Sequence, residues 1–151
     1  MEVFRLSKTK YKSTLSGKGA SRYGARWNSQ GTELIYTASS RALAMAEVVV
    51  HISAETLAND YYMLVIYVPD TTPIRSASPE ELPNGWNRFP YTPGTQFFGD
   101  RLISENRYGI LKVPSAVVKG DFNFLINPFH HSFKYIKIID EEPFLFDQRV
   151  F

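Results

Sequence analysis

Glu47 is the residue whose type and position in this sequence most clearly suggest chemistry. In a predicted helix, Leu43, Glu47 and Val50 follow one another at helical spacing, so the carboxylate falls within the apolar stripe. A carboxylate there costs free energy unless it is paired or hydrogen-bonded, and groups in such settings are often functional. The spacing alone fits a functional group, a structural ion pair with Arg26 or Arg22, or a stripe edge that stays in water.

Arg26 and Tyr36 are placed symmetrically about Gly31, which belongs to a turn signal, Ser-Gln-Gly. A hairpin centred on this glycine would put the two side chains opposite each other on one face, with Cβ atoms roughly 5 Å apart. A guanidinium would then lie beside an aromatic ring. A register shift of one residue would separate them, and by spacing alone a surface arginine and a core tyrosine are the simpler interpretation.

Ser115 follows Pro114 at the end of an apolar segment, where side chains often project into a cleft. No Gly-x-Ser-x-Gly sequence surrounds it, so an orienting hydrogen bond or an ordinary turn is favoured over a nucleophile. The histidines, His51, His130 and His131, lack the spacing of an HExxH zinc site, and no metal site is predicted. They leave open a metal-independent ribonuclease that uses histidines as acid and base.

The elements that must position these residues are mostly strands. Segment 7–21 is expected to be a mobile loop and segment 73–94 a long ordered loop, because glycine, serine and proline gather there. Helices are predicted from Ser39 or Ser40 to about His51, and over residues 95–106. Strands are predicted at residues 33–37, 61–68, 110–113, 122–126, 135–139 and 144–146. This order predicts one α+β domain over residues 1–151, with a mainly antiparallel sheet and a few helices.

The composition is that of a globular domain, with 44% hydrophobic and 21% charged residues. The net charge is only +2 and the basic residues are scattered, so the basic stripe of a duplex-binding protein is missing. The absence of cysteine excludes disulfides and thiol catalysis. The first residues lack the apolar run of a signal peptide and no segment is long enough to span a bilayer, so a soluble cytoplasmic protein is expected.

The run SRYGARWNSQGTELIYTASSRALAMAEVVVHI resembles the opening signature of RES-domain toxins, which occur in RES–Xre toxin–antitoxin modules. The family is named for an arginine, a glutamate and a serine, matched here by Arg26 in ARWN, Glu47 in ALAMAE and Ser115 in KVPSAVV. Tyr36 in LIYTA matches a fourth functional position. Because ELPNGW, VPSAVV and FNFLINPFHHSF also fit the pattern, the likeness covers essentially the whole chain.

Two positions depart from the family pattern. Ala25 stands where the family commonly has a second glycine, and Leu102 stands where it often has a tryptophan. Neither is a named functional residue, so they bear on pocket shape and rate more than on reaction type.

The resemblance implies an ADP-ribosyltransferase-like fold and consumption of NAD⁺ as a substrate, with no prosthetic group. The reaction would be hydrolysis or phosphorolysis of the nicotinamide–ribose bond, or alternatively ADP-ribosylation of a protein. The implied partner is an Xre-type helix-turn-helix antitoxin. The toxin would form a homodimer or a hetero-oligomer with this antitoxin, and it would not contact nucleic acid or membrane directly. A ribonuclease toxin and a non-catalytic binding module are the remaining alternatives.

The chemistry of breaking the nicotinamide–ribose bond suggests a role for each of these residues. Glu47 would stabilise the positive charge that develops on ribose, and Arg26 would bind the pyrophosphate. Tyr36 would stack on nicotinamide, and Ser115 would position a ribose hydroxyl or Glu47. The further ligand-binding residues expected are Arg22, Lys18 and Trp27, with Trp86 or Phe89 closing over the adenine.

Overall fold

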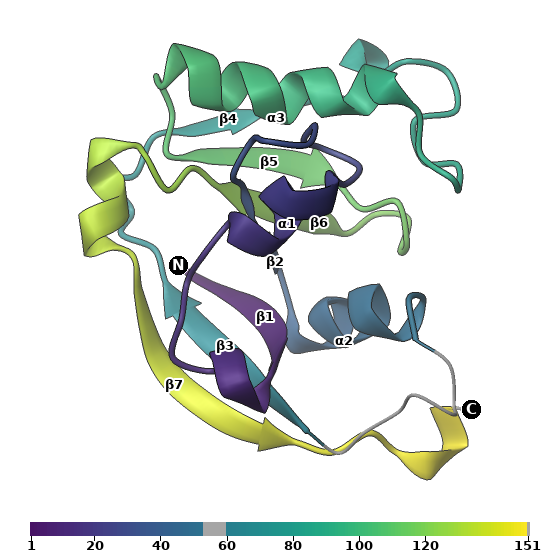
Figure 1. Cartoon of the computed structure of the whole chain (residues 1–151), viewed down its shortest axis with the longest axis vertical. Coiled ribbons are helices and arrows are strands. Elements are labelled where there is room, and N and C mark those ends of the chain that lie inside the picture. The colour runs from purple at the N-terminus through teal and green to yellow at the C-terminus, as the bar shows by residue number, and fades with distance from the viewer. Residues whose placement is uncertain (53–59, 151) are drawn as a thin grey trace.

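The computed structural model describes residues 1–52 and 60–150, and its seven strands form one sheet in the order β4-β5-β6-β2-β1-β3-β7 (Figure 1). Every neighbouring pair is antiparallel except β4 and β5. The predicted α+β class with a mainly antiparallel sheet is therefore confirmed. The strands are β1 Glu2–Lys8, β2 Ile35–Ala38, β3 Tyr61–Tyr67, β4 Ile74–Ser76, β5 Ile110–Pro114, β6 Phe122–Ile126 and β7 Lys137–Phe144. The α-helices are α1 Lys18–Tyr23, α2 Arg41–Val49 and α3 Pro93–Glu105.

The sheet is nearly divided between β1 and β2. These strands are joined through the single residue pair Phe4–Ala38, whereas β1 pairs with β3 along its whole length and β2 does so with β6. Figure 1 shows the two groups of strands running at an angle to each other. The two halves of the sheet are therefore joined at a single residue pair.

Alternation along the strands fills two separate cores. In β3, Met63 and Val65 pack toward α2, whereas Leu64 and Ile66 belong to the core cluster of Val3, Ile35 and Ile126. This follows from the period of two in a strand and explains why the central run of β3 is apolar throughout. Beneath α3, a third cluster contains Trp27, Leu34, Leu102, Leu111 and Leu125.

The helix that carries Glu47 begins where the sequence predicts. Ser40 is extended, and its Oγ accepts a hydrogen bond from the backbone N–H of Leu43 at 3.1 Å, which is the N-cap interaction. Leu43 and Ala44 are buried, and the helix packs against β1 and β2. It ends at Val49, earlier than the predicted His51.

Two predicted loops are wrong in part. Segment 7–21 contains the end of β1, a 3₁₀ turn at Thr9–Tyr11 and the first residues of α1. Segment 73–94 contains β4, a 3₁₀ turn at Pro79–Glu81 and the start of α3. The predicted strand over residues 135–139 corresponds to the start of β7, which follows the 3₁₀ turn His131–Tyr135. The predicted strand over residues 144–146 is wrong except at Phe144, where β7 ends.

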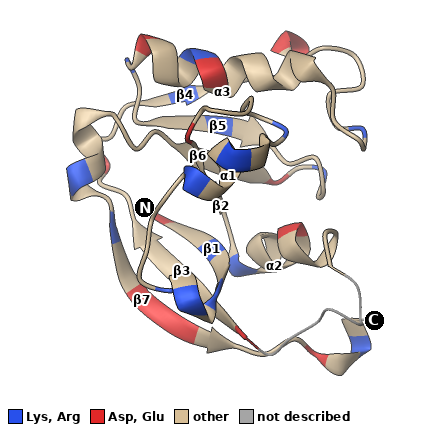
Figure 2. Cartoon of the chain, viewed as in Figure 1, with Lys and Arg blue, Asp and Glu red and all other residues tan. Residues whose placement is uncertain are grey.

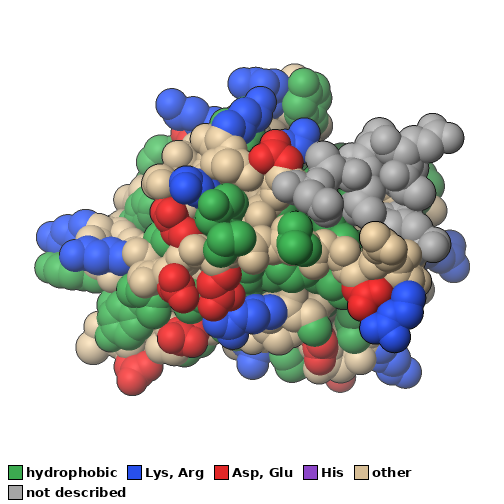
Figure 3. Space-filling model, turned by 90° about the horizontal axis from the view of Figure 1, so that it is seen from below, with side chains coloured by type: hydrophobic (Ala, Val, Ile, Leu, Met, Phe, Trp, Pro, Cys, Tyr) green, Lys and Arg blue, Asp and Glu red, His purple; other side chains and the backbone are tan. Residues whose placement is uncertain are grey.

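Lysine and arginine are spread over many elements rather than gathered on one (Figure 2). The face drawn in Figure 3 likewise mixes hydrophobic, basic and acidic side chains. Within residues 1–52 and 60–150, no helix has the length and apolar character needed to cross a membrane.

Candidate active site

A cavity of about 710 Å³ lies at the division between β1 and β2. Ligand sites commonly measure about 300–1,000 Å³ and combine apolar walls with a few polar groups. Its walls come from both halves of the sheet, from α2 and from the segments before α3 and after β5. The residues that line the cavity include Arg5, Arg26, Trp27, Tyr36, Glu47, His51, Asn87, Phe89, Tyr91 and Asn123.

Glu47 is a half-buried carboxylate in the wall of this cavity. Burial raises the pKa of Glu47 above its usual range, while the side chains of Asn123 and Ser115 act to lower it. The charges of His51 and Arg26 also lower it, to a smaller extent. The site therefore holds a carboxylate in poorly hydrated surroundings, where its field acts strongly on a cation.

Ser115 lies beneath Glu47 rather than in the cavity wall. Its Oγ accepts hydrogen bonds from the backbone N–H groups of Val117 and Val118, both at 3.0 Å, and donates to Glu47 Oε1 at 3.4 Å. Because two N–H groups occupy the acceptor side of the hydroxyl, its hydrogen is directed at the carboxylate. Ser115 is 4% exposed and is not among the residues that line the cavity.

Arg26 connects the cavity to the segment before α3. Its Nη1 donates to the carbonyl oxygens of Trp86 at 2.7 Å and Arg88 at 2.9 Å. Burial lowers the pKa of Arg26, and the nearby charge of Glu47 raises it. Part of this guanidinium is thus committed to the protein backbone, while the residue still lines the cavity.

Arg26 and Tyr36 meet through a turn, and the predicted hairpin between them is wrong. Arg26 and Trp27 form a tight turn closed by the bridge between Ala25 and Asn28. The Tyr36 hydroxyl accepts a hydrogen bond from the Trp27 N–H at 3.0 Å and donates to Asn28 Oδ1 at 2.6 Å. Burial raises the pKa of Tyr36 well above its usual range, so its hydroxyl stays neutral and keeps donating.

Asn28 anchors this turn and was missed by sequence reasoning. It is fully buried, and its Nδ2 donates to the carbonyl oxygens of Ala20, Ser29 and Thr32 at 3.0–3.2 Å. A buried amide that satisfies several backbone groups at once fixes the local backbone. Asn28 could have been singled out in the sequence because it directly follows Arg26 and Trp27.

Helix α3 holds the turn from the other side. Thr95 Oγ1 donates to Arg26 O at 2.6 Å, and Gln96 Nε2 donates to the carbonyl oxygens of Ala25 and Asn28, both at 3.1 Å. Further along, Ser29 donates through its N–H and its hydroxyl to Asp100 at 2.9 and 2.6 Å. The position of Arg26 therefore depends on a helix more than sixty residues away in the chain.

Arg5 is a second cation of the cavity wall that sequence reasoning missed. It lies on β1 next to Phe4, the residue that joins the two halves of the sheet. Burial lowers the pKa of Arg5, and no neighbouring charge offsets that effect. Within the described part of the chain, its guanidinium donates no hydrogen bond and forms no ion pair.

Known proteins match this chain along almost its whole length. A family model described as "RES domain" matches residues 2–147. The "Prs ADP-ribosylating toxin" of Sphingobium sp. (strain YBL2) is 40% identical over 138 residues, which cover 90% of this chain and 86% of the relative. A "Toxin Res" of Yersinia enterocolitica is 36% identical over 153 residues, covering 99% of both chains. The chain belongs to the RES-domain family of toxins.

A solved structure agrees in fold with this RES domain. A chain in the crystal structure of the M. tuberculosis MbcT–MbcA toxin–antitoxin complex superposes with a TM-score of 0.75 at 20% sequence identity. The match covers 95% of this chain and 83% of that chain. At this identity the likeness shows the fold.

The RES domain brings together most of the residues that the sequence singled out. Arg26, Tyr36 and Glu47 line one cavity, and Ser115 bonds to Glu47. Trp27 also lines it, but is only 3% exposed. The roles proposed for these residues remain predictions.

Of the other expected ligand-binding residues, only Phe89 lines the cavity. Arg22 and Lys18 are exposed on α1 and are not among the cavity-lining residues, so their placement gives the expected roles no support. Trp86 packs against Trp27 with ring centroids 6.1 Å apart, and only Phe89 of the two expected adenine partners lines the cavity.

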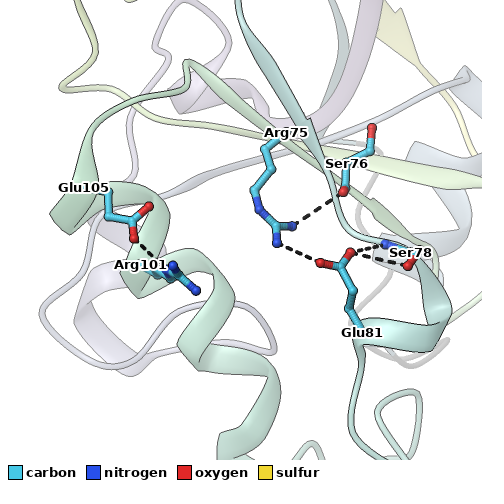
Figure 4. Close-up of polar contacts among 6 residues, drawn as sticks. All are labelled: Arg75, Ser76, Ser78, Glu81, Arg101 and Glu105. Atoms are coloured by element: carbon cyan, nitrogen blue, oxygen red, sulfur yellow. Dashed lines mark hydrogen bonds and ion pairs between the residues drawn. The ribbon is translucent and has the colours of Figure 1, made fainter.

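Two other features of the RES domain lie outside the cavity. His130 and His131 stack with centroids 4.2 Å apart, and His130 Nδ1 bonds to Ser132 Oγ at 2.7 Å. Within the described residues, no group of three potential metal ligands occurs. A smaller hollow of about 200 Å³ beside α3 contains Arg75, which pairs with Glu81 at 2.8 Å (Figure 4). The pairing of Arg75 contrasts with Arg5, which forms an ion pair with no described residue.

Proposed function

We propose that this RES domain is the toxin of a toxin–antitoxin system and that it cleaves the nicotinamide–ribose bond of NAD⁺. One observation carries the proposal. A half-buried carboxylate, Glu47, shares a cavity large enough for a dinucleotide with two arginines, Arg5 and Arg26. This combination suits a ligand with a pyrophosphate and a reacting centre that becomes cationic.

The chemistry requires little more than electrostatics and positioning. The bond between ribose C1′ and the pyridinium nitrogen breaks, and nicotinamide leaves as a neutral molecule with the bonding electron pair. Positive charge then develops on C1′ and the ring oxygen, as in glycoside hydrolysis. Glu47 stabilises that charge or accepts a hydrogen bond from a ribose hydroxyl, and Ser115 keeps the carboxylate in place. An acceptor oxygen bonds to C1′ and loses its proton, which completes the reaction.

The arginines bind the pyrophosphate in this proposal. Arg5 has no competing partner within the described residues, so it supplies charge-assisted hydrogen bonds most freely. Arg26 shares its guanidinium between the ligand and the carbonyl oxygens of Trp86 and Arg88. Tyr36 presents its ring to nicotinamide while its hydroxyl is held by the turn.

Transfer of ADP-ribose to a protein is the second candidate. It is favoured by the name of the Sphingobium relative, an ADP-ribosylating toxin at 40% identity. The cavity would bind NAD⁺ in the same way, and a side chain of the target would replace water or phosphate as the acceptor.

Product analysis separates these reactions. The purified chain is incubated with NAD⁺ labelled in the adenylate part, alone, with phosphate, and with cell extract. Hydrolysis predicts free ADP-ribose in every mixture, phosphorolysis predicts ADP-ribose-1″-phosphate only where phosphate is present, and transfer predicts label on a protein band. If NAD⁺ stays intact in all three mixtures, the proposed function is wrong.

The proposed partner is an Xre-type antitoxin that neutralises the toxin in the cytoplasm, where NAD⁺ is available. The solved relative in fold was crystallised in a toxin–antitoxin complex, which supports such a partner. Co-expression with an Xre-type antitoxin should restore growth and yield a complex that co-purifies. Growth arrest that persists despite co-expression would contradict this partner.

A further inference from the structure

Segment 83–91, between the 3₁₀ turn Pro79–Glu81 and α3, forms one wall of the cavity. Asn87, Phe89 and Tyr91 of this segment all line it. The Phe89 ring is 79% exposed. Among the described residues it stacks on no other ring, whereas Trp86 is packed against Trp27. Ligand pockets are lined mainly by apolar and aromatic side chains, so a ring at the edge of this cavity is suited to contact a ligand.

The backbone that carries Phe89 is held in place before any ligand binds. Arg26 Nη1 binds the carbonyl oxygens of Trp86 and Arg88, which lie on the amino-terminal side of the phenylalanine. Within the segment, the N–H of Arg88 donates to Gly85 O at 3.0 Å. A ring offered from a fixed backbone loses little entropy on binding, so its contact contributes fully to affinity.

The ligand proposed for the cavity carries two flat rings, and the cavity assigns them different walls. The nicotinamide must lie near Glu47, because the bond that breaks joins it to the ribose. The arginines then take the pyrophosphate, and the second ring requires a different aromatic surface. Phe89 offers a face for stacking, and the exposed amide of Asn87 offers a donor and an acceptor that match the edge of adenine.

We propose that Phe89 and Asn87 form the adenine-binding wall of the cavity, so that the site selects a purine-containing dinucleotide over a mononucleotide. The inference rests on the proposed function and names the part of the substrate that this wall binds. Stacking of a base on an aromatic side chain changes affinity by roughly 5- to 150-fold. Phe89 therefore acts on the binding of the adenylate part of the substrate.

The test compares two substrates that share the reacting bond, NAD⁺ and nicotinamide mononucleotide, which lacks the adenylate. Phe89→Ala should raise KM for NAD⁺ about tenfold and leave kcat unchanged, because uniform binding is lost. It should leave both constants for the mononucleotide unchanged, and Phe89→Trp should keep KM for NAD⁺ near wild type. Phe97→Ala is the matched control, since Phe97 is 61% exposed but lines the smaller hollow beside α3.

A direct binding measurement tests the adenine wall without any turnover. Calorimetric titration with AMP should show binding to the wild type, and about tenfold weaker binding to Phe89→Ala but not to Phe97→Ala. If the wild type binds AMP and leaves NAD⁺ intact, the proposed reaction fails while the adenine wall stands. Equal AMP affinity in wild type and Phe89→Ala, or equal effects on the two nicotinamide substrates, overturns the inference. The inference is also overturned if Phe89→Ala leaves KM for NAD⁺ and the affinity for AMP unchanged but no longer binds a protein partner.

Discussion

Replacing Arg5 with methionine should weaken NAD⁺ binding and stabilise the fold at the same time. Arg5 lies in the cavity wall, burial lowers its pKa, and no described residue pairs with it. Methionine keeps an unbranched side chain of similar length and removes the charge. The two effects have opposite signs because the charge contributes to ligand binding and opposes folding.

The expected changes in KM and Tm follow because no described residue forms an ion pair with Arg5. Hydrogen bonds from a charged group to phosphate are worth about 1.5–3 kcal/mol, so KM for NAD⁺ should rise roughly 10- to 150-fold with kcat unchanged. Replacing a poorly solvated charge with an apolar group should stabilise the fold by about 1 kcal/mol. For a chain of this size that corresponds to a rise in Tm of about 3 °C.

Steady-state kinetics and thermal unfolding on the same preparation measure both quantities. Arg75→Met is the matched control, because Arg75 pairs with Glu81 outside the cavity and should leave KM for NAD⁺ unchanged. A fall in Tm of the Arg5 variant together with an unchanged KM would refute the reasoning. It would mean that Arg5 serves the fold.

Four other expectations follow from the same structure. The raised pKa of Glu47 should make kcat/KM fall on the acidic side at a pH above the pKa of an ordinary glutamate. A fall centred at or below about pH 4.3 would contradict this. Because the folded state binds this proton more tightly, stability should fall as pH rises from the ordinary pKa through the raised one, and denaturation midpoints of Glu47→Gln should lack this fall. A Cβ at Gly99 would overlap the Trp27 carbonyl oxygen, so Gly99→Ala should lower Tm sharply while Gly19→Ala, with open space around it, should not; equal effects would refute this. Tyr36→Phe leaves two hydrogen-bonding groups of the turn without their partner and should destabilise the protein by about 1–3 kcal/mol in a urea titration, and an unchanged midpoint would count against the observed bonds.

Local pattern was enough to predict the elements that carry their own signals. Helix α2 follows from the Ser40 cap and the alanine-rich run after it. Strands β3, β5 and β6 follow from short apolar runs with clear ends. Such elements are determined by neighbours in sequence, so one chain suffices to find them.

The other features of the site depend on contacts between residues that are far apart in the sequence. The turn at Arg26 replaces the predicted hairpin because α3 binds its carbonyl oxygens, and because the Asn28 side chain donates to carbonyl oxygens on both sides of the turn. Arg5 gains significance only from the division between β1 and β2, which no local spacing reveals. Glu47 could be predicted because an acidic residue in an apolar helical stripe is anomalous by itself, whereas a lone arginine in a strand is not.

The central claim is that Glu47 acts on the bond that breaks and contributes little to holding the dinucleotide. Measuring kcat and the Kd for NAD⁺ in wild type and Glu47→Gln tests it most directly. The account predicts a loss of about 10²-fold or more in kcat with a Kd close to that of the wild type. Turnover near the wild-type rate, or a variant that no longer binds NAD⁺, would contradict it.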